Sequence, residues 1–305
     1  MVSAAAGVLA ALDLRHRCVA VDHLTIGSID PADWDQVFLL AVETTFKIRP
    51  AMEHIGDKLV VICSSREPGL DRWLNFFFPH MLFSIRHSGD SDTAPLNHYL
   101  YDALMGREKD SRTVLLQHLE TAELLDKGLI GYAPGNYYGP KNKLNASKYY
   151  NGLWEYETSE IKNLYDNELN YLLSRDSTTR LPDGHFSSGV IPSHIYKRSK
   201  FSIAAETDNV GNHVFVTEKT WKPMMFRKDI LFYATAGHED FLESLGFEIP
   251  LKTGGDPAKI VEHLTNMEKK WDAKWLDAQH HNHQLCNPQR WISVFYSWLD
   301  RNVRT

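Results

Sequence analysis

The chain has few cysteines and no long apolar run. Its 305 residues include only three cysteines, Cys18, Cys63 and Cys286, which lie far apart in the sequence. An odd number of cysteines at such distances fits neither a disulfide framework nor a zinc-ligand spacing, so we expect free thiols and a reducing, cytoplasmic setting. No apolar stretch reaches the length of about 20 residues that a membrane-spanning helix needs, and we expect no membrane partner.

The chain also lacks an excess of positive charge. It has 33 basic and 39 acidic residues and a formal net charge of −6, which excludes a globally basic nucleic-acid binder but leaves a local basic groove open. Residues 1–14 are rich in alanine, and the first arginines, Arg15 and Arg17, follow them. A signal peptide has its basic residues before its apolar residues, so we expect none here. The sequence shows no internal repeat.

Short apolar runs alternate with helical patterns. Residues 36–42 and 58–63 form continuous apolar runs of strand length, followed by Glu43 and, four residues after the second run, by Glu67. Such runs are typical of parallel strands that are buried on both faces. A second strand, helix and strand are expected at residues 201–205, 217–226 and 230–234.

This alternation predicts an α/β protein with two Rossmann-like units. Residues 131–152 are rich in Gly, Pro, Asn and Tyr and are expected to form a loop between the units. We therefore expect an N-terminal domain at residues 1–150 and a second domain at residues 151–285. Residues 286–305 are expected to form a C-terminal helix, and packing of this helix back onto the N-terminal domain is one possibility.

The most informative stretch follows the apolar strand at residues 201–205. The strand ends on a carboxylate, and a polar loop leads to the start of a helix; the residues of interest are Glu206, Thr207, Phe215, Thr217, Glu218 and Lys219. A helix N-terminus presents free N–H groups and a partial positive charge, so it attracts phosphate. Lys219 adds a full charge there, and Glu218 can accept hydrogen bonds from ribose hydroxyls. These residue types suit a nucleotide sugar.

The same stretch resembles the α-1,3-fucosyltransferases. These enzymes have an aromatic residue, then Glu-Asn, a short loop and Tyr-Val-Thr-Glu-Lys before a helix. The corresponding positions here are Phe201, Glu206-Thr207 and Phe215-Val216-Thr217-Glu218-Lys219. The Thr-Glu-Lys-Thr-Trp-Lys-Pro form also looks like that of phage and algal-virus glycosyltransferases. The resemblance covers residues 195–250 or so, and a weaker phage-type similarity lies at residues 100–130.

The resemblance implies a GT-B fold, in which two Rossmann-like domains face each other. It implies a metal-independent glycosyltransferase that uses a nucleoside-diphosphate sugar, a GDP- or UDP-sugar, as co-substrate and needs no other cofactor. Glu218 would bind the ribose and Lys219 the diphosphate, with Glu206 beside them. Thr207 stands where the family has Asn, and Phe215 where it has Tyr, so specificity for fucose and guanine is not implied.

The catalytic residues are less well defined by the sequence. An inverting transferase needs a carboxylate that takes the proton of the acceptor hydroxyl, and Glu43 and Glu67 are equal candidates. Arg198, before the second-domain strand, is a candidate for the cation that stabilises the leaving diphosphate. Arg175 and Arg180 are competing candidates for the same role. Arg112 is either a contact to a phosphate or an acceptor, or a plain surface residue.

Two short motifs contain residue types that bind metals, but neither is best interpreted as a metal site. Asp90-Ser91-Asp92 matches a metal-binding D-x-D but is more typical of a turn. His280, His281 and His283 with Cys286 fit no standard metal spacing, so we expect no metal.

The acceptor is open between a hydroxymethylated pyrimidine in phage DNA, a glycan and a protein. The Lys- and Tyr-rich loop at residues 137–150 favours DNA, while the net charge favours the others. A nucleotide-sugar-binding protein without transferase activity is the alternative.

Overall fold

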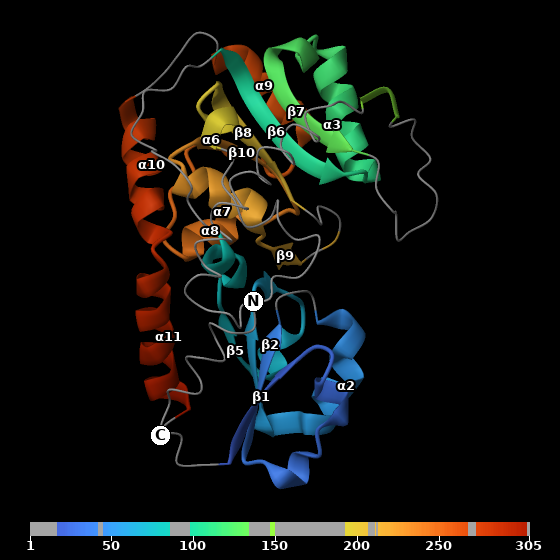
Figure 1. The fold of residues 1–305 in the computed structure, drawn as a ribbon, viewed down its shortest axis with the longest axis vertical. Coiled ribbons are helices and arrows are strands. Elements are labelled where there is room, and N and C mark those ends of the chain that lie inside the picture. Colours follow the sequence, from blue (N-terminus) through green and yellow to red (C-terminus); the bar gives the residue numbers. More distant parts are fainter. Residues whose placement is uncertain are drawn as a thin grey trace, which may run out of the picture.

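The protein is an α/β molecule built on two parallel sheets. The structure, a computed structural model, describes residues 17–41, 45–85, 98–133, 147–149, 193–206, 211, 213–267 and 273–303. Each sheet has four strands, in the orders β1-β2-β3-β5 and β10-β8-β6-β7, and the two sheets lie at opposite ends of the molecule in Figure 1. The expected α/β class with parallel sheets is confirmed, and it is compatible with Rossmann-like units.

The first sheet is formed by residues 18–77. Its strands are β1 (Cys18–Asp22), β2 (Gln36–Ala41), β3 (Leu59–Cys63) and β5 (Leu74–Phe77). The apolar runs of β2 and β3 are buried on both faces because helices cover both sides of the sheet. Met52 and Ile55 of α2 (Arg49–Ile55) pack with one face. Phe295 and Leu299 of α11 (Pro288–Asn302) pack with the other face.

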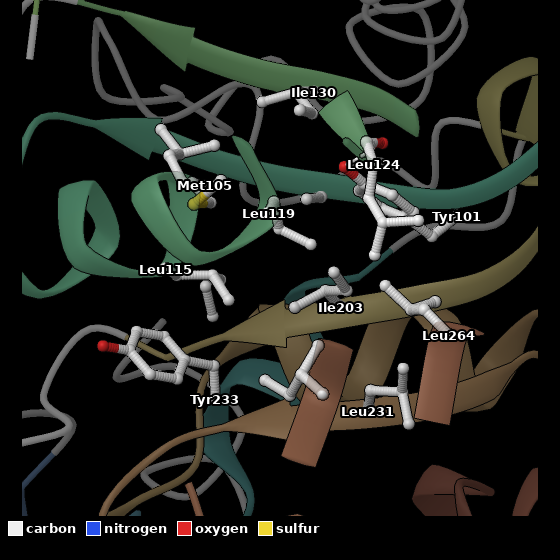
Figure 2. Packing of buried hydrophobic residues seen from close by; sticks show 14 of the residues in the cluster. Tyr101, Met105, Leu115, Leu119, Leu124, Ile130, Ile203, Leu231, Tyr233 and Leu264 are labelled. Atoms are coloured by element: carbon white, nitrogen blue, oxygen red, sulfur yellow. Dashed lines mark hydrogen bonds between the residues drawn. The ribbon is translucent and has the colours of Figure 1, made fainter. Parts of the chain in front are cut away.

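The second sheet combines two segments that are far apart in the sequence. Its strands are β6 (Tyr99–Arg107), β7 (Gly128–Ala133), β8 (Ser199–Ala205) and β10 (Asp229–Tyr233). One face packs against α3 (Asp110–Thr121) and α9 (Pro257–Met267), where Leu115, Leu119 and Leu264 meet Ile203 and Leu231, as Figure 2 shows.

The opposite face of this sheet packs against α7 (Glu218–Met225) and α8 (His238–Ser244). Ala204 and Phe232 face these helices, since side chains alternate between the two faces along a strand. Two helices, α6 (Ser193–Tyr196) and α10 (Ala273–Leu285), complete the second half. Within the described residues, no helix combines the length and the apolar character needed to cross a membrane.

The sheet boundary differs from the domain boundary expected from the sequence. Residues 99–133 were expected in the N-terminal domain, yet β6 pairs with β8 as a parallel neighbour, and the amide of Tyr99 donates to the carbonyl of Arg198 at 2.8 Å. The division between the sheets therefore lies between Ile85 and Tyr99 and not near residue 150. Pairing between strands so distant in sequence leaves no local pattern, which is why the sequence did not reveal it.

A two-stranded antiparallel ladder joins the two halves. β4 (Ser65–Arg66) directly follows β3, and β9 (Val214–Phe215) lies on the segment after β8; Ser65 pairs with Phe215. The amide of Val216 also donates to the carbonyl of Ser64 at 3.3 Å. Because both segments follow the carboxyl ends of their strands, the ladder brings the carboxyl edges of the two sheets next to each other. Figure 1 shows β9 between the two halves.

Candidate functional site

The strand order of the second sheet defines a switch point. The chain runs from β6 through α3 to the edge strand β7, and from β8 through α7 to the other edge strand β10. The two connections cover opposite faces, so they diverge between β6 and β8. Ligands of open α/β sheets bind in the crevice outside the carboxyl ends of the strands at such a point. This position is where the candidate site is built.

Arg112 brings a cation to this point. It lies in the first turn of α3, is 3 % exposed, and its Nη2 donates to the carbonyl of Ala205 at 3.4 Å. Ala205 is the last residue of β8, directly before Glu206. Tyr233, at the end of β10, donates from its hydroxyl to the carbonyl of Ser111 at 2.9 Å. The start of α3 is therefore tied to the carboxyl ends of both β8 and β10.

Glu206 anchors the start of α7. Its Oε1 accepts the backbone amide of Thr217 at 3.0 Å and the hydroxyl of Thr220 at 2.6 Å, while Oε2 accepts the hydroxyl of Thr217 at 2.5 Å. Burial raises the pKa of Glu206, and the charge of Lys219 and the two threonine hydroxyls oppose this shift. Since Glu206 is 1 % exposed, we correct its expected role: it positions the loop before α7 and is not open to a donor molecule.

Glu218 and Lys219 lie at the helix N-terminus and are only partly exposed. Thr217 caps the helix by accepting the amide of Lys219 at 3.3 Å. Nζ of Lys219 lies 2.6 Å from Oε1 of Glu218, and both side chains are 16 % exposed. Burial opposes ionisation of Glu218, but the charges of Lys219 and Lys222 and the hydrogen bond from Lys219 outweigh it and lower the pKa of Glu218 to about 2. At neutral pH Glu218 is thus a carboxylate that only accepts hydrogen bonds.

His238 is a member of the site that the sequence analysis did not identify. Its Nε2 lies 3.4 Å from the hydroxyl of Thr220, which also donates to Glu206. The ring packs on Phe232 with centroids 5.4 Å apart. Burial lowers the pKa of His238 to about 4, so the ring is neutral at physiological pH. Nothing in the local sequence links His238 to Glu206, because the contact depends on how α8 packs beside α7.

The structure does not bring Arg198 to the site. Arg198 is exposed in the turn before β8, whereas Glu206 follows the other end of the same strand. A strand rises about 3.3 Å per residue, so the seven residues of β8 place the two about 20 Å apart. The geometry therefore places Arg198 away from the candidate site, with no direct contact to the N-terminus of α7. Arg112, from the neighbouring strand connection, lies at the carboxyl edge instead.

Glu67 is held as firmly as Glu206. Its oxygens accept the amide and the hydroxyl of Thr45 at 2.8 and 2.7 Å and the hydroxyl of Ser65 at 2.7 Å. Nη2 of Arg49 forms an ion pair with it at 3.2 Å, and Glu67 is 4 % exposed. Burial and these partners leave Glu67 little access to an acceptor hydroxyl, which counts against it as the base. Glu43 lies outside the described residues.

The remaining expected residues divide between structural roles and undescribed segments. Phe215 is 7 % exposed and belongs to β9 of the joining ladder. His281 and His283 bond to the carbonyls of Gly246 and Met225 at 2.9 and 2.7 Å. No group of three or more His, Cys, Asp or Glu suited to a metal occurs in the part of the chain that the structure describes. The positions outside the described residues are Asp90, Asp92, Arg175, Arg180, Thr207 and the loop at residues 137–146.

The arrangement can hold a negatively charged ligand that carries hydroxyl groups. The α7 N-terminus brings Lys219 and the acceptor oxygens of Glu218 together, and Arg112 is bonded to the carbonyl of Ala205 at the same edge of the sheet. When protein-family models and curated protein sequences are compared with this chain, neither gives a match.

Proposed function

We propose that the protein is a GT-B glycosyltransferase that uses a nucleoside-diphosphate sugar. The single observation that carries this proposal is the α7 N-terminus with Glu218 and Lys219, which follows the carboxyl edge of the second sheet beside its switch point. The diphosphate would lie beside Lys219 at the positive end of the α7 dipole, where positive charge favours an anion. Glu218 would accept hydrogen bonds from the ribose hydroxyls.

The transfer reaction needs a cation that stabilises the leaving group and a base that takes the acceptor proton. The acceptor oxygen forms a bond to the anomeric carbon, the bond between that carbon and the diphosphate oxygen breaks, and the acceptor proton passes to a base. Lys219 would stabilise the negative charge that develops on the leaving diphosphate. If the reaction inverts the anomeric carbon, a carboxylate of the first half is the expected base, and Glu43 is the remaining candidate of the original pair.

The GT-B arrangement is part of the proposal. The ladder of β4 and β9 sets the carboxyl edges of the two sheets next to each other, which is how two facing Rossmann-like domains enclose a donor and an acceptor. The acceptor would then approach from the first sheet. A hydroxymethylated pyrimidine in phage DNA, a glycan and a protein are the candidate acceptors.

A calorimetric screen of GDP-, UDP- and CMP-sugars tests the proposal. We expect one class to bind and the corresponding nucleoside diphosphate to compete with it. Failure of every nucleotide sugar to bind would contradict the proposal. The same screen identifies the base and the sugar.

The second candidate function is nucleotide-sugar binding without transfer. The engagement of Glu67 by Thr45, Ser65 and Arg49 favours it, since this removes one of the two expected bases. Hydrolysis of the bound donor in the absence of an acceptor separates the two functions. Slow release of free sugar supports the transferase, and a donor that stays intact through long incubation supports the binder.

A further inference from the structure

The carboxylates of Glu67 and Glu206 are bound in the same way. In each case one threonine donates its backbone amide to Oε1 and its hydroxyl to Oε2; these are Thr45 and Thr217. A second hydroxyl, from Ser65 or Thr220, donates to Oε1 of the same carboxylate. Each of the two threonines directly precedes a helix, η3 (Phe46–Ile48) or α7. We call these two arrangements the first and second carboxylate clasps.

The clasps lie on either side of the β4–β9 ladder. Glu67 follows β4, and Thr217 follows β9 two residues after Phe215. The second clasp presents Glu218 and Lys219 to the proposed donor. By the same construction, the first clasp presents Phe46 and Lys47, which follow Thr45, at the carboxyl edge of the first sheet.

Phe46 is an aromatic residue held in an exposed position. It is 46 % exposed, the only aromatic side chain among the described residues that is so open to solvent. The ring of His213 meets its ring edge-on at 5.3 Å. The guanidinium of Arg49 lies 5.8 Å from the Phe46 ring and 5.4 Å from the Trp73 ring, and Arg49 is fixed by its ion pair with Glu67. Phe46 is thus exposed beside the junction of the two halves, with Arg49 over its ring and His213 at an angle to it.

The basic residues near Phe46 in the sequence divide into paired and unpaired ones. Arg49 pairs with Glu67, and Arg72 pairs with Glu53. Lys47 and Arg66 are exposed, and neither forms an ion pair within the described part of the chain. An aromatic face with nearby cations is the combination that binds single-stranded nucleic acid, since bases stack on the ring and phosphates meet the cations.

We infer that Phe46 and Lys47 form an acceptor subsite for a nucleotide unit of a single-stranded polynucleotide. The base stacks on Phe46, and Lys47 meets a neighbouring phosphate. Glu67 and Thr45 are positioning residues that hold this segment as Glu206 and Thr217 hold the donor segment. The role of this surface as an acceptor subsite rests on the proposed glycosyltransferase function. Binding of a polynucleotide to the surface is independent of that function, because it is measured without a donor.

Fluorescence anisotropy with a labelled single-stranded pyrimidine oligonucleotide tests the inference. We expect the full-length protein to bind it and the affinity to fall as salt rises from about 50 to about 200 mM. Phe46→Ala should weaken binding about tenfold or more, and Lys47→Gln should reduce the salt slope by about 1. The matched controls are Leu276→Ala, since Leu276 on α10 is also 46 % exposed, and Lys259→Gln on α9; both should bind as the parent does.

Three outcomes would overturn the inference. The first is that the parent fails to bind the oligonucleotide at low salt. The second is that Phe46→Ala binds the oligonucleotide as tightly as the parent does. The third is that the parent binds a neutral oligosaccharide and no oligonucleotide. Donor binding by the parent is measured separately by calorimetry. Loss of donor binding contradicts the proposed function and leaves the oligonucleotide result standing, so the two failures are distinguishable.

Discussion

Replacing Thr220 by valine tests the second carboxylate clasp. Valine has nearly the shape of threonine, so Thr220→Val removes the hydroxyl that donates to Glu206 at 2.6 Å without opening a cavity. Thr220 is completely buried, and water cannot replace the lost donor. A hydrogen bond to a charged group contributes about 1.5–3 kcal/mol, and the added methyl group recovers at most about 0.8 kcal/mol. We expect the free energy of unfolding to fall by about 1–2 kcal/mol.

A double-mutant cycle with Glu206→Gln separates this contact from other effects of the substitution. Urea denaturation of the parent, both single variants and the double variant gives the coupling energy between Thr220 and Glu206. We expect a coupling of at least about 1 kcal/mol, because residues that share a hydrogen bond are not additive. Thr265→Val, at an exposed threonine on α9, is the control and should show no coupling to Glu206. Additivity within about 0.5 kcal/mol for Thr220 and Glu206 would refute the clasp.

Two further predictions concern stability. Burial lowers the pKa of His80 and of His238 to about 4, so the unfolded chain takes up protons between about pH 6.5 and pH 4 that the folded chain does not. The two histidines should therefore lower the free energy of unfolding as the pH drops from 7 to 5, by at most about 1.4 kcal/mol per pH unit for each. Glu206, whose pKa burial raises, acts in the opposite direction, so the histidine effect is measured as a difference between proteins. Urea titrations at both pH values should show a smaller fall for His238→Gln than for the parent, and equal falls would be inconsistent with a buried neutral ring. Phe295→Ala should lower the free energy of unfolding by about 3–5 kcal/mol, since Phe295 is fully buried between α11 and the first sheet. Val294→Ala, at an exposed neighbour, is the control and should change it by no more than about 0.5 kcal/mol. Equal effects of the two substitutions in thermal unfolding would contradict this packing.

The sequence predicted those features that depend on neighbouring residues. The apolar runs of β2, β3, β8 and β10 and the helix that begins at Thr217-Glu218-Lys219 are visible because each is encoded within a few positions. The central strand β6 was missed. The acidic residue Asp102 interrupts the apolar pattern of this strand in the sequence. In the structure Asp102 is buried, and its carboxylate accepts hydrogen bonds from two residues of β8, Ser199 at 2.6 Å and Ser202 at 2.8 Å.

The candidate site was predictable only in its local part. Glu218 and Lys219 follow from a helix start, but the position of Arg112 depends on the pairing of β6 with β8, which brings residues 112 and 205 together. Arg198 is close to Glu206 in sequence, yet a strand separates them. The burial of Glu67 and Glu206 also depends on threonines from other segments. Sequence therefore identified residue types for the site, and topology decided which of them meet.

The most direct test of the account is calorimetric titration of a nucleoside diphosphate into the parent, Lys219→Ala and Arg198→Ala. If the diphosphate binds at the N-terminus of α7, loss of the Lys219 charge should weaken binding about tenfold or more, which corresponds to about 1.4 kcal/mol. Arg198→Ala should bind as the parent does, because Arg198 lies at the opposite end of β8. A Lys219→Ala variant that binds as tightly as the parent, or an Arg198→Ala variant that loses binding, would contradict the proposed site.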